Sequence, residues 1–215
     1  TGDDNTQINI GTLSYEENAN RVPVPYVLPP GIEREKDASG MNVIQRDEQS
    51  LTLKVTNLRD GDARAVYKNM GYDLRQFERL KMFIHAEDVE NSGDLNPGDI
   101  TVFVRIGSDF TDNYYEYEIP LTVTEHGYYN NDNESDRRMV WPNKNMLDIS
   151  FDVLTVVKNN RNRLKNSGNN DVSQSTIYSE YDPQNPENKI SIIGNPSIGN
   201  VRAIMIGIRN NSLAT

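Results

Sequence analysis

Cysteine is absent from all 215 residues of this sequence. Its absence excludes catalysis by a thiol, thiolate ligands for a metal and a disulfide framework. Stability does not require disulfides here, because a protein of this length buries roughly 70% of the surface that its unfolded form exposes. The length suits one substantial domain, or one domain with an extended arm.

Positive charge and long apolar runs are also scarce. The chain has 22 basic and 32 acidic residues and a net charge of −10, whereas a surface that binds nucleic acid is basic. No stretch reaches the roughly 18 consecutive apolar residues of a membrane-spanning helix, and no signal-peptide pattern follows Thr1. We therefore expect no nucleic-acid partner. We interpret the chain as a segment, itself not membrane-spanning, of a longer protein whose targeting signal lies elsewhere.

Residues that carry catalysis are few. His85 and His126 are the only histidines, and neither has a second histidine at the spacing of a zinc or iron site. The sequence has no nucleophile elbow and no phosphate-binding loop. Glu116 and Glu118 share the expected solvent-facing side of one strand, which does not favour an acid–base pair. We expect no enzymatic activity and no cofactor.

One acidic stretch has the spacing of a calcium loop. Asp132, Glu134 and Asp136 lie two residues apart, as ligands do in such loops. The stretch lacks the glycine at the sixth position and the distal bidentate glutamate. We interpret it as a charged surface loop and leave calcium binding open.

Turn-forming residues are plentiful, with 14 glycines and 10 prolines. Residues 1–50 read as an extended N-terminal arm and loop, rich in proline at 21–31. Proline fixes φ and lacks a backbone donor, so this part is expected to be polyproline-like and to lie on a surface. The four prolines of the arm are Pro23, Pro25, Pro29 and Pro30.

From residue 51 onward, apolar and polar residues alternate in a way that predicts strands. The predicted strands are 51–56, 79–86, 100–106 and 113–124, with a central strand at 201–208 that is apolar on both faces. Phe151, Leu154 and Val157 share one face of a predicted helix at about 147–165, and a helical turn is expected near 73–78. The fold class is therefore mainly β: a β-sandwich at 51–215, with a jelly roll as one form of it, and one packed α-helix.

Two phenylalanines depart from the alternation. Phe83 and Phe103 point to the face opposite the aliphatic rows, so either a local loop or helix covers them, or another part of a longer protein does. The second alternative makes Phe83, Phe103 and the arm's four prolines a candidate docking surface. A different function, carbohydrate binding by a β-sandwich, would use exposed aromatic rings, for which the candidates are Tyr114, Tyr128, Tyr129 and Trp141.

Several stretches resemble one known family. They are Val24–Arg34, Asn57–Lys68, Arg79–Ala86, Asn113–Glu118, Ile193–Arg202 and Met205–Asn210. In order and length they are similar to the SprA/Sov family, the giant outer-membrane translocon of the type IX secretion system and of gliding motility. They span about residues 22–210, and none is a catalytic motif.

The resemblance implies a parent that forms a very large outer-membrane β-barrel, of which this chain would be a water-exposed part on the periplasmic or extracellular side. It implies a non-catalytic structural, gating or interaction module at the cell envelope. The implied partners are the remainder of the parent translocon, other secretion-system subunits and secreted protein cargo. The alternative that the residues leave open is a carbohydrate-binding β-sandwich module of a surface glycan system.

Overall fold

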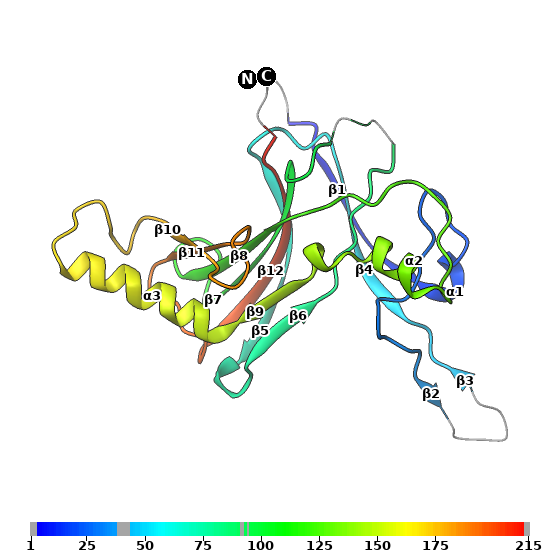
Figure 1. Cartoon of the computed structure of the whole chain (residues 1–215). Helices are drawn as coiled ribbons and strands as arrows, with labels where there is room; N and C mark the ends of the chain where they lie inside the picture. Colours follow the sequence, from blue (N-terminus) through cyan, green and yellow to red (C-terminus); the bar gives the residue numbers. More distant parts are fainter. Residues whose placement is uncertain (1–3, 38–43, 91–92, 94, 213–215) are drawn as a thin grey trace. The chain divides into compact units, whose positions relative to one another are not determined.

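The computed structural model describes residues 4–37, 44–90, 93 and 95–212, and its contacts divide the chain into two compact units (Figure 1). Unit 1 consists of Thr1–Leu58, Phe83–Pro97 and Thr122–Met146, and unit 2 of Arg59–Met82, Gly98–Leu121 and Leu147–Thr215. The expected arm of residues 1–50 lies within the first of the three segments that make up unit 1. The first division between the two units falls after Leu58, and a domain boundary at residue 50 stays a prediction.

Unit 2 is built on a six-stranded antiparallel sheet with the order β10-β11-β8-β7-β12-β5. Its strands are β5 (Ala63–Tyr72), β7 (Ile100–Gly107), β8 (Tyr114–Pro120), β10 (Tyr178–Tyr181), β11 (Lys189–Ile193) and β12 (Val201–Asn210). The apolar strand predicted at 201–208 is an inner strand, because β12 pairs with β7 on one edge and β5 on the other. The prediction of a mainly β fold is confirmed.

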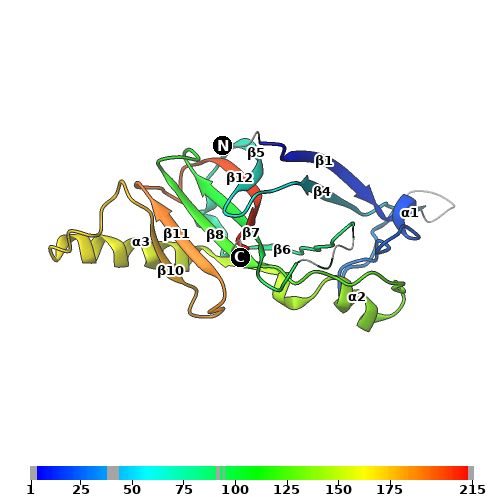
Figure 2. The same ribbon diagram turned by 90° about the horizontal axis from the view of Figure 1, so that it is seen from above.

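A helix and a short ladder form the second layer of unit 2. Figures 1 and 2 show α3 (Phe151–Asn166) and the pair β6 (Arg79–Met82) and β9 (Leu147–Ser150) on one face of the large sheet. Leu154 and Val157 of α3 are buried, and α3 contacts β10 and β11. The packed helix is confirmed, but its predicted start at 147 was wrong, since residues 147–150 alternate and pair with β6.

Two cations of α3 bind the turn that leads into β12. Arg161 is fully buried, and its Nη1 donates to the carbonyl of Gly194 at 2.6 Å. Lys158 Nζ donates to the carbonyl of Pro196 at 2.7 Å. Burial lowers the pKa of both groups. The expected helical turn near 73–78 is also present, as η1 (Leu74–Gln76) capped by Asp73.

Unit 1 contains an eight-residue antiparallel ladder between β1 (Gln7–Ser14) and β4 (Gln49–Thr56). Its other elements are α1 (Tyr15–Asn18), β2 (Lys36–Asp37), β3 (Ile44–Gln45), α2 (Glu134–Val140) and η2 (Asn143–Asn145). In the described parts of the chain, no helix is both long and apolar enough to span a membrane.

The core of unit 1 is where the sequence-based expectation fails most clearly. The cluster of buried residues there consists of Val24, Tyr26, Val27, Leu28, Val140 and Trp141. The proline-rich arm was expected to lie on a surface, but most of this core comes from it. The physical reason is that apolar side chains separate its prolines, and a residue without an N–H has one backbone donor fewer to satisfy on burial.

Candidate functional site

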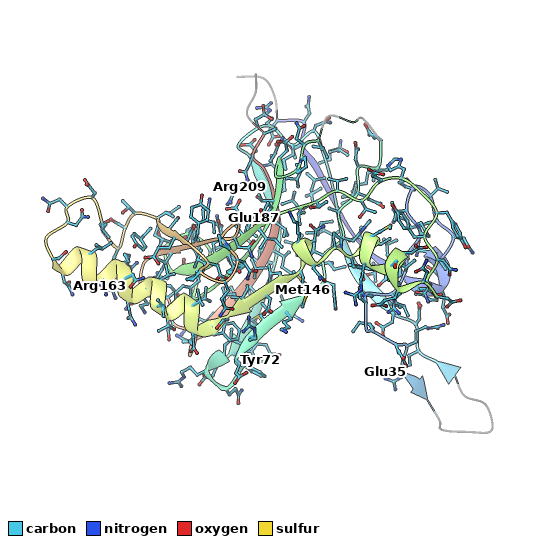
Figure 3. The ribbon with its side chains drawn as sticks, viewed as in Figure 1. Glu35, Tyr72, Met146, Arg163, Glu187 and Arg209 are labelled. Atoms are coloured by element: carbon cyan, nitrogen blue, oxygen red, sulfur yellow. The ribbon has the colours of Figure 1, made fainter. Side chains whose placement is uncertain are left out.

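A row of paired charges crosses the sheet of unit 2 on the face opposite α3. Arg105 of β7 lies directly across from Glu116 of β8, and its Nε donates to Glu116 Oε2 at 2.5 Å. Arg209 of β12 (Figure 3) reaches Glu116 Oε1 at 3.1 Å and Glu118 Oε2 at 2.5 Å. Lys189 of β11 completes the row, with Nζ 3.0 Å from Glu118 Oε2.

Both glutamates of this row are buried, each with 4% of its surface exposed. The expectation that they face solvent was therefore wrong. Burial alone would raise the pKa of Glu118, but the hydrogen bond from Thr101 and the charges of Arg209 and Lys189 outweigh it and bring the pKa to about 2. Glu118 Oε2 lacks hydrogen-bond geometry toward either cation, so these two contacts are ion pairs.

Phe103 lies beneath the cations of the same row. The guanidinium carbon of Arg209 lies 4.7 Å from the Phe103 ring centroid, and that of Arg105 lies 5.3 Å from it. The ring has room because Gly207 is directly opposite on β12, where a Cβ would come within 2.3 Å of Phe103 Cζ. With 2% of its surface exposed, Phe103 presents no surface for docking in this fold.

Phe83 lies in unit 1. The strand predicted at 79–86 ends one residue before it, at Met82. The Phe83 ring packs edge-on against Trp141, with centroids 6.4 Å apart. The two phenylalanines therefore lie in different units. Phe103 is covered within the chain, whereas Phe83 is only partly buried, and docking through Phe83 stays a prediction. Of the arm's prolines, Pro25 is buried, whereas Pro23, Pro29 and Pro30 are partly exposed. Docking by these prolines stays a prediction.

The proposed sugar-binding platform is not present as an exposed surface. Trp141 is 7% exposed and donates its indole N–H to the carbonyl of Val27 at 2.8 Å. Tyr114 is 4% exposed and lies beneath Arg105. Tyr129 is partly buried against the core cluster and donates its hydroxyl to the carbonyl of Glu125 at 2.9 Å. Tyr128 is 81% exposed, but a single exposed ring does not make a platform. Because Trp141 and Tyr114 belong to the core, the four candidate rings do not favour the carbohydrate-binding alternative.

A chain of contacts in unit 1 has the order of a nucleophile, a base and an acid. Thr124 Oγ1 lies 3.3 Å from His85 Nδ1, and His85 Nε2 lies 3.2 Å from Glu87 Oε2. Nδ1, however, is also 2.9 Å from the carbonyl of Val140, to which it must donate. A nitrogen that donates cannot take the proton of the hydroxyl, and Thr124 is only 5% exposed.

The same glutamate joins the arm to the segment after Met82. Arg21 forms a two-point ion pair with Glu87. Burial opposes ionisation of Glu87, but the hydrogen bonds from His85 and Arg21 outweigh it and lower its pKa. The second histidine, His126, bonds through Nε2 to the carbonyl of Asp88. These contacts give both histidines a structural role.

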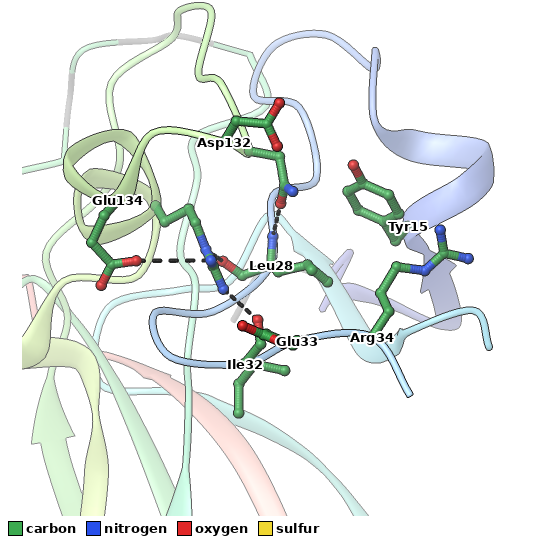
Figure 4. A pocket seen from close by; sticks show the side chains of 9 residues that line it. Tyr15, Leu28, Ile32, Glu33, Arg34, Asp132 and Glu134 are labelled. Carbon is green, nitrogen blue, oxygen red and sulfur yellow. Dashed lines mark hydrogen bonds and ion pairs between the residues drawn. The ribbon is translucent and has the colours of Figure 1, made fainter. Parts of the chain in front are cut away.

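An open hollow of about 490 Å³ lies between the arm and α2 (Figure 4). Arg137 crosses it, donating to the carbonyls of Leu28, Pro29 and Ile32. Arg34 is stacked on the ring of Tyr15 at 5.3 Å. Both cations are engaged in holding the arm, and we assign no ligand to this hollow.

The acidic stretch with calcium-loop spacing begins a helix. The interpretation as a loop was wrong, because Asn133 caps α2 and Glu134 and Asp136 lie in its first turn, where negative charge is favourable. Asp136 Oδ2 also accepts from the N–H of Asn130 at 2.8 Å. Within the described residues, no group of three or more histidine or acidic side chains could hold a metal ion.

The comparison with family models gives one match. Residues 1–215 match SprA_N, described as a motility related/secretion protein. The chain belongs to the SprA_N family. This confirms the resemblance drawn from the sequence, and places the chain in a family described by motility and secretion and not by a reaction. A search of curated proteins found no match.

In this SprA_N chain, the ionisable groups described above stabilise the fold. The buried glutamates of unit 2 are paired with cations across strands, and its buried Arg161 donates to the carbonyl of Gly194. In unit 1, Arg21 and Arg137 hold the arm in place. One signal for the charged row is visible in the sequence, because Arg105 and Arg209 fall on the side of their strands opposite the isoleucine residues. Sequence reasoning missed the row because the pairing between strands was unknown.

Proposed function

We propose that this SprA_N chain is a non-catalytic structural and interaction module of the type IX secretion translocon, which also serves gliding motility. The observation that carries the proposal is the family match, since it extends over all 215 residues. The internal pairing of charges in both units supports a role in shape and contact instead of chemistry.

The module would act by steric fit and recognition. A sheet whose inner charges are tied across β12, β7, β8 and β11 keeps its shape, because each buried glutamate has two cationic partners and separating the strands would leave its charge unpaired. Such a rigid body can cap a pore, shape its lumen or contact cargo. In this proposal the parent protein lies in the outer membrane, and the module faces water on the periplasmic or extracellular side.

The partners in this proposal are the remainder of the translocon, other secretion-system subunits and secreted cargo. The arm is one place of contact, because Pro23, Pro29 and Pro30 are partly exposed and Val22 is 88% exposed. An exposed apolar side chain next to proline-fixed backbone loses little conformational freedom on binding.

The proposal is tested first by fractionating the envelope and probing it with antiserum raised against this chain. A very large band in the outer-membrane fraction supports it, and protease shaving of intact cells then gives the side of the membrane. A small soluble or secreted band contradicts it.

The docking part is tested by Val22→Asp in the chromosomal gene. If the contact contributes about 1.4 kcal/mol, secreted protein in the medium should fall up to about tenfold, with the parent protein unchanged in amount and location. The matched control is Ile177→Asp, which charges an apolar residue of unit 2 that is 60% exposed. Normal secretion by the Val22 variant would remove the arm from the proposal.

A further inference from the structure

The β1–β4 ladder of unit 1 carries its apolar residues on one face. Ile8 lies opposite Val55, Ile10 opposite Leu53, and Thr12 opposite Leu51. Because side chains alternate along a strand, these residues form one face with five aliphatic side chains. The other face holds Asn9, Gly11 and Leu13 of β1 and Ser50, Thr52 and Lys54 of β4.

The polar face is the one that turns toward the core. Leu13 packs against the core cluster, Ser50 shares a hydrogen bond of 2.5 Å with the hydroxyl of Tyr26, and the hydroxyl of Thr52 is buried. On the apolar face, Ile10 is 62% exposed and Leu51 is 56% exposed, while Ile8, Leu53 and Val55 are partly buried. This is the reverse of the usual arrangement, in which the apolar face of an antiparallel sheet packs on the core.

The edges of the ladder lack the usual protection. Within the described part of the chain, β1 and β4 pair only with each other. Their register runs through eight residues without a bulge. Neither strand contains proline, and the only charge in the two is Lys54 on β4. Natural edge strands are normally blunted by lysine, proline or bulges, and a two-stranded ladder is stable only marginally.

We propose that the edge of β1 binds an extended strand of another polypeptide chain and so extends the ladder. The added strand would carry aliphatic side chains at alternate positions, continuing the face of Ile8 and Ile10. Backbone hydrogen bonds would supply affinity and the alternate side chains selectivity. The edge of β1 is chosen over that of β4 because β1 carries no charge. The inference does not depend on the proposed role in secretion.

Charge indicates what the strand should carry at one end. Glu16, Glu17, Asp47 and Glu48 lie just beyond the pair Ser14 and Gln49, where the ladder ends. Arg34 pairs with Glu16, whereas Glu17 and Glu48 have no ion pair among the described residues. A strand with lysine or arginine at this end is complementary. A second copy of this chain would bring the same acids and a net charge of −10.

The direct test uses a synthetic peptide and the unaltered 215-residue chain. The peptide has isoleucine or valine at alternate positions, threonine between them, two lysines at one end and a fluorescent label, and binding is followed by anisotropy. In an extended peptide, successive N–H groups point to opposite edges. N-methylation of one alternate set of amides should therefore weaken binding by about tenfold or more, and methylation of the other set should not. Equal binding by both methylated peptides, or no binding by the parent peptide, would overturn the proposal.

Substitutions in β1 give a second test. Ile10→Lys places a charge on the apolar face and should abolish binding, while Asn9→Thr, an uncharged substitution one residue away on the other face, should retain it. Both positions are exposed, and the fluorescence of Trp141 in the core of unit 1 checks that each variant folds. Equal effects of the two substitutions would contradict the proposal. So would a dimer in sedimentation that Ile10→Lys alone dissociates, because the occupant would then be a second copy.

Discussion

The effect on stability of adding one methyl group at Gly207 can be worked out from the atoms around it. In Gly207→Ala, the new Cβ would lie 2.3 Å from Phe103 Cζ and 2.7 Å from Ala65 Cβ, whereas carbon atoms in contact lie about 3.5–4.0 Å apart. Phe103 cannot move outward easily, because Arg105 and Arg209 cover its ring. The alanine must therefore displace the ring or part β12 from β5.

The expected cost follows from two opposing effects. Overpacking of a filled interior costs about 1–3 kcal/mol, and replacing glycine with alanine recovers about 0.4–1 kcal/mol by restricting the unfolded chain. The free energy of unfolding should fall by about 1–2 kcal/mol. For a protein of this size, each kcal/mol corresponds to about 2–4 °C in the unfolding temperature.

The assay is urea and thermal unfolding of the 215-residue chain followed by far-ultraviolet circular dichroism. The matched control is Gly71→Ala in β5, where a Cβ would meet no atom within 4 Å, and which should be neutral or slightly stabilising. Phe103→Leu should reduce the penalty of Gly207→Ala, so the double variant should lose less than the two single losses together. Equal stability of the Gly207 and Gly71 variants would refute the reasoning.

Two further predictions concern buried charges of unit 2. Because the pKa of Glu118 is lowered to about 2 from an ordinary 4.5, its contribution to stability is fully present above pH 4.5 and is lost as pH falls through about 2. Between pH 4.5 and about 2, the free energy of unfolding should thus drop less steeply in Glu118→Gln than in the exposed control Glu187→Gln. Parallel plots of this free energy against pH for the two variants would contradict the prediction. Arg161→Met, which keeps much of the volume of the fully buried Arg161 and removes its charge, should leave the free energy of unfolding in urea unchanged or raised. Arg161→Ala should lower that free energy by about 2–5 kcal/mol because of the cavity. A large loss in both Arg161 variants would show that the bond to Gly194 outweighs desolvation.

The sequence predicted elements whose pattern is local. The strands predicted at 100–106 and 113–124 were found because their side chains alternate, although the second, β8, already ends at Pro120. The helix was found because Leu154 and Val157 recur on one face. β5 was missed because it lies at the edge of the sheet, where both faces carry polar residues and the period of two is lost. The start of α3 was predicted too early, because Leu147 and Ile149 are compatible with a strand as well as with the first turn of a helix.

The candidate site was beyond prediction because it depends on which strands pair. Glu116 and Glu118 look solvent-facing along their own strand. Their partner Arg209 comes from β12, more than 90 residues later, and only the register brings it across β7. Burial of the arm depends in the same way on Val140 and Trp141, which complete its core from another segment.

The division of the chain into two units has a consequence for biosynthesis. Going by their limits, the chain passes from one unit to the other five times, at residues 58/59, 82/83, 97/98, 121/122 and 146/147. Neither unit can therefore be completed by a contiguous stretch as it leaves a ribosome or a translocation pore. Unit 1 must wait for residues up to 146, while the first strands of unit 2 are already exposed without partners. Folding that depends on such distant pairings is slow and leaves strand edges open to association, so we expect chaperones to attend this segment during synthesis.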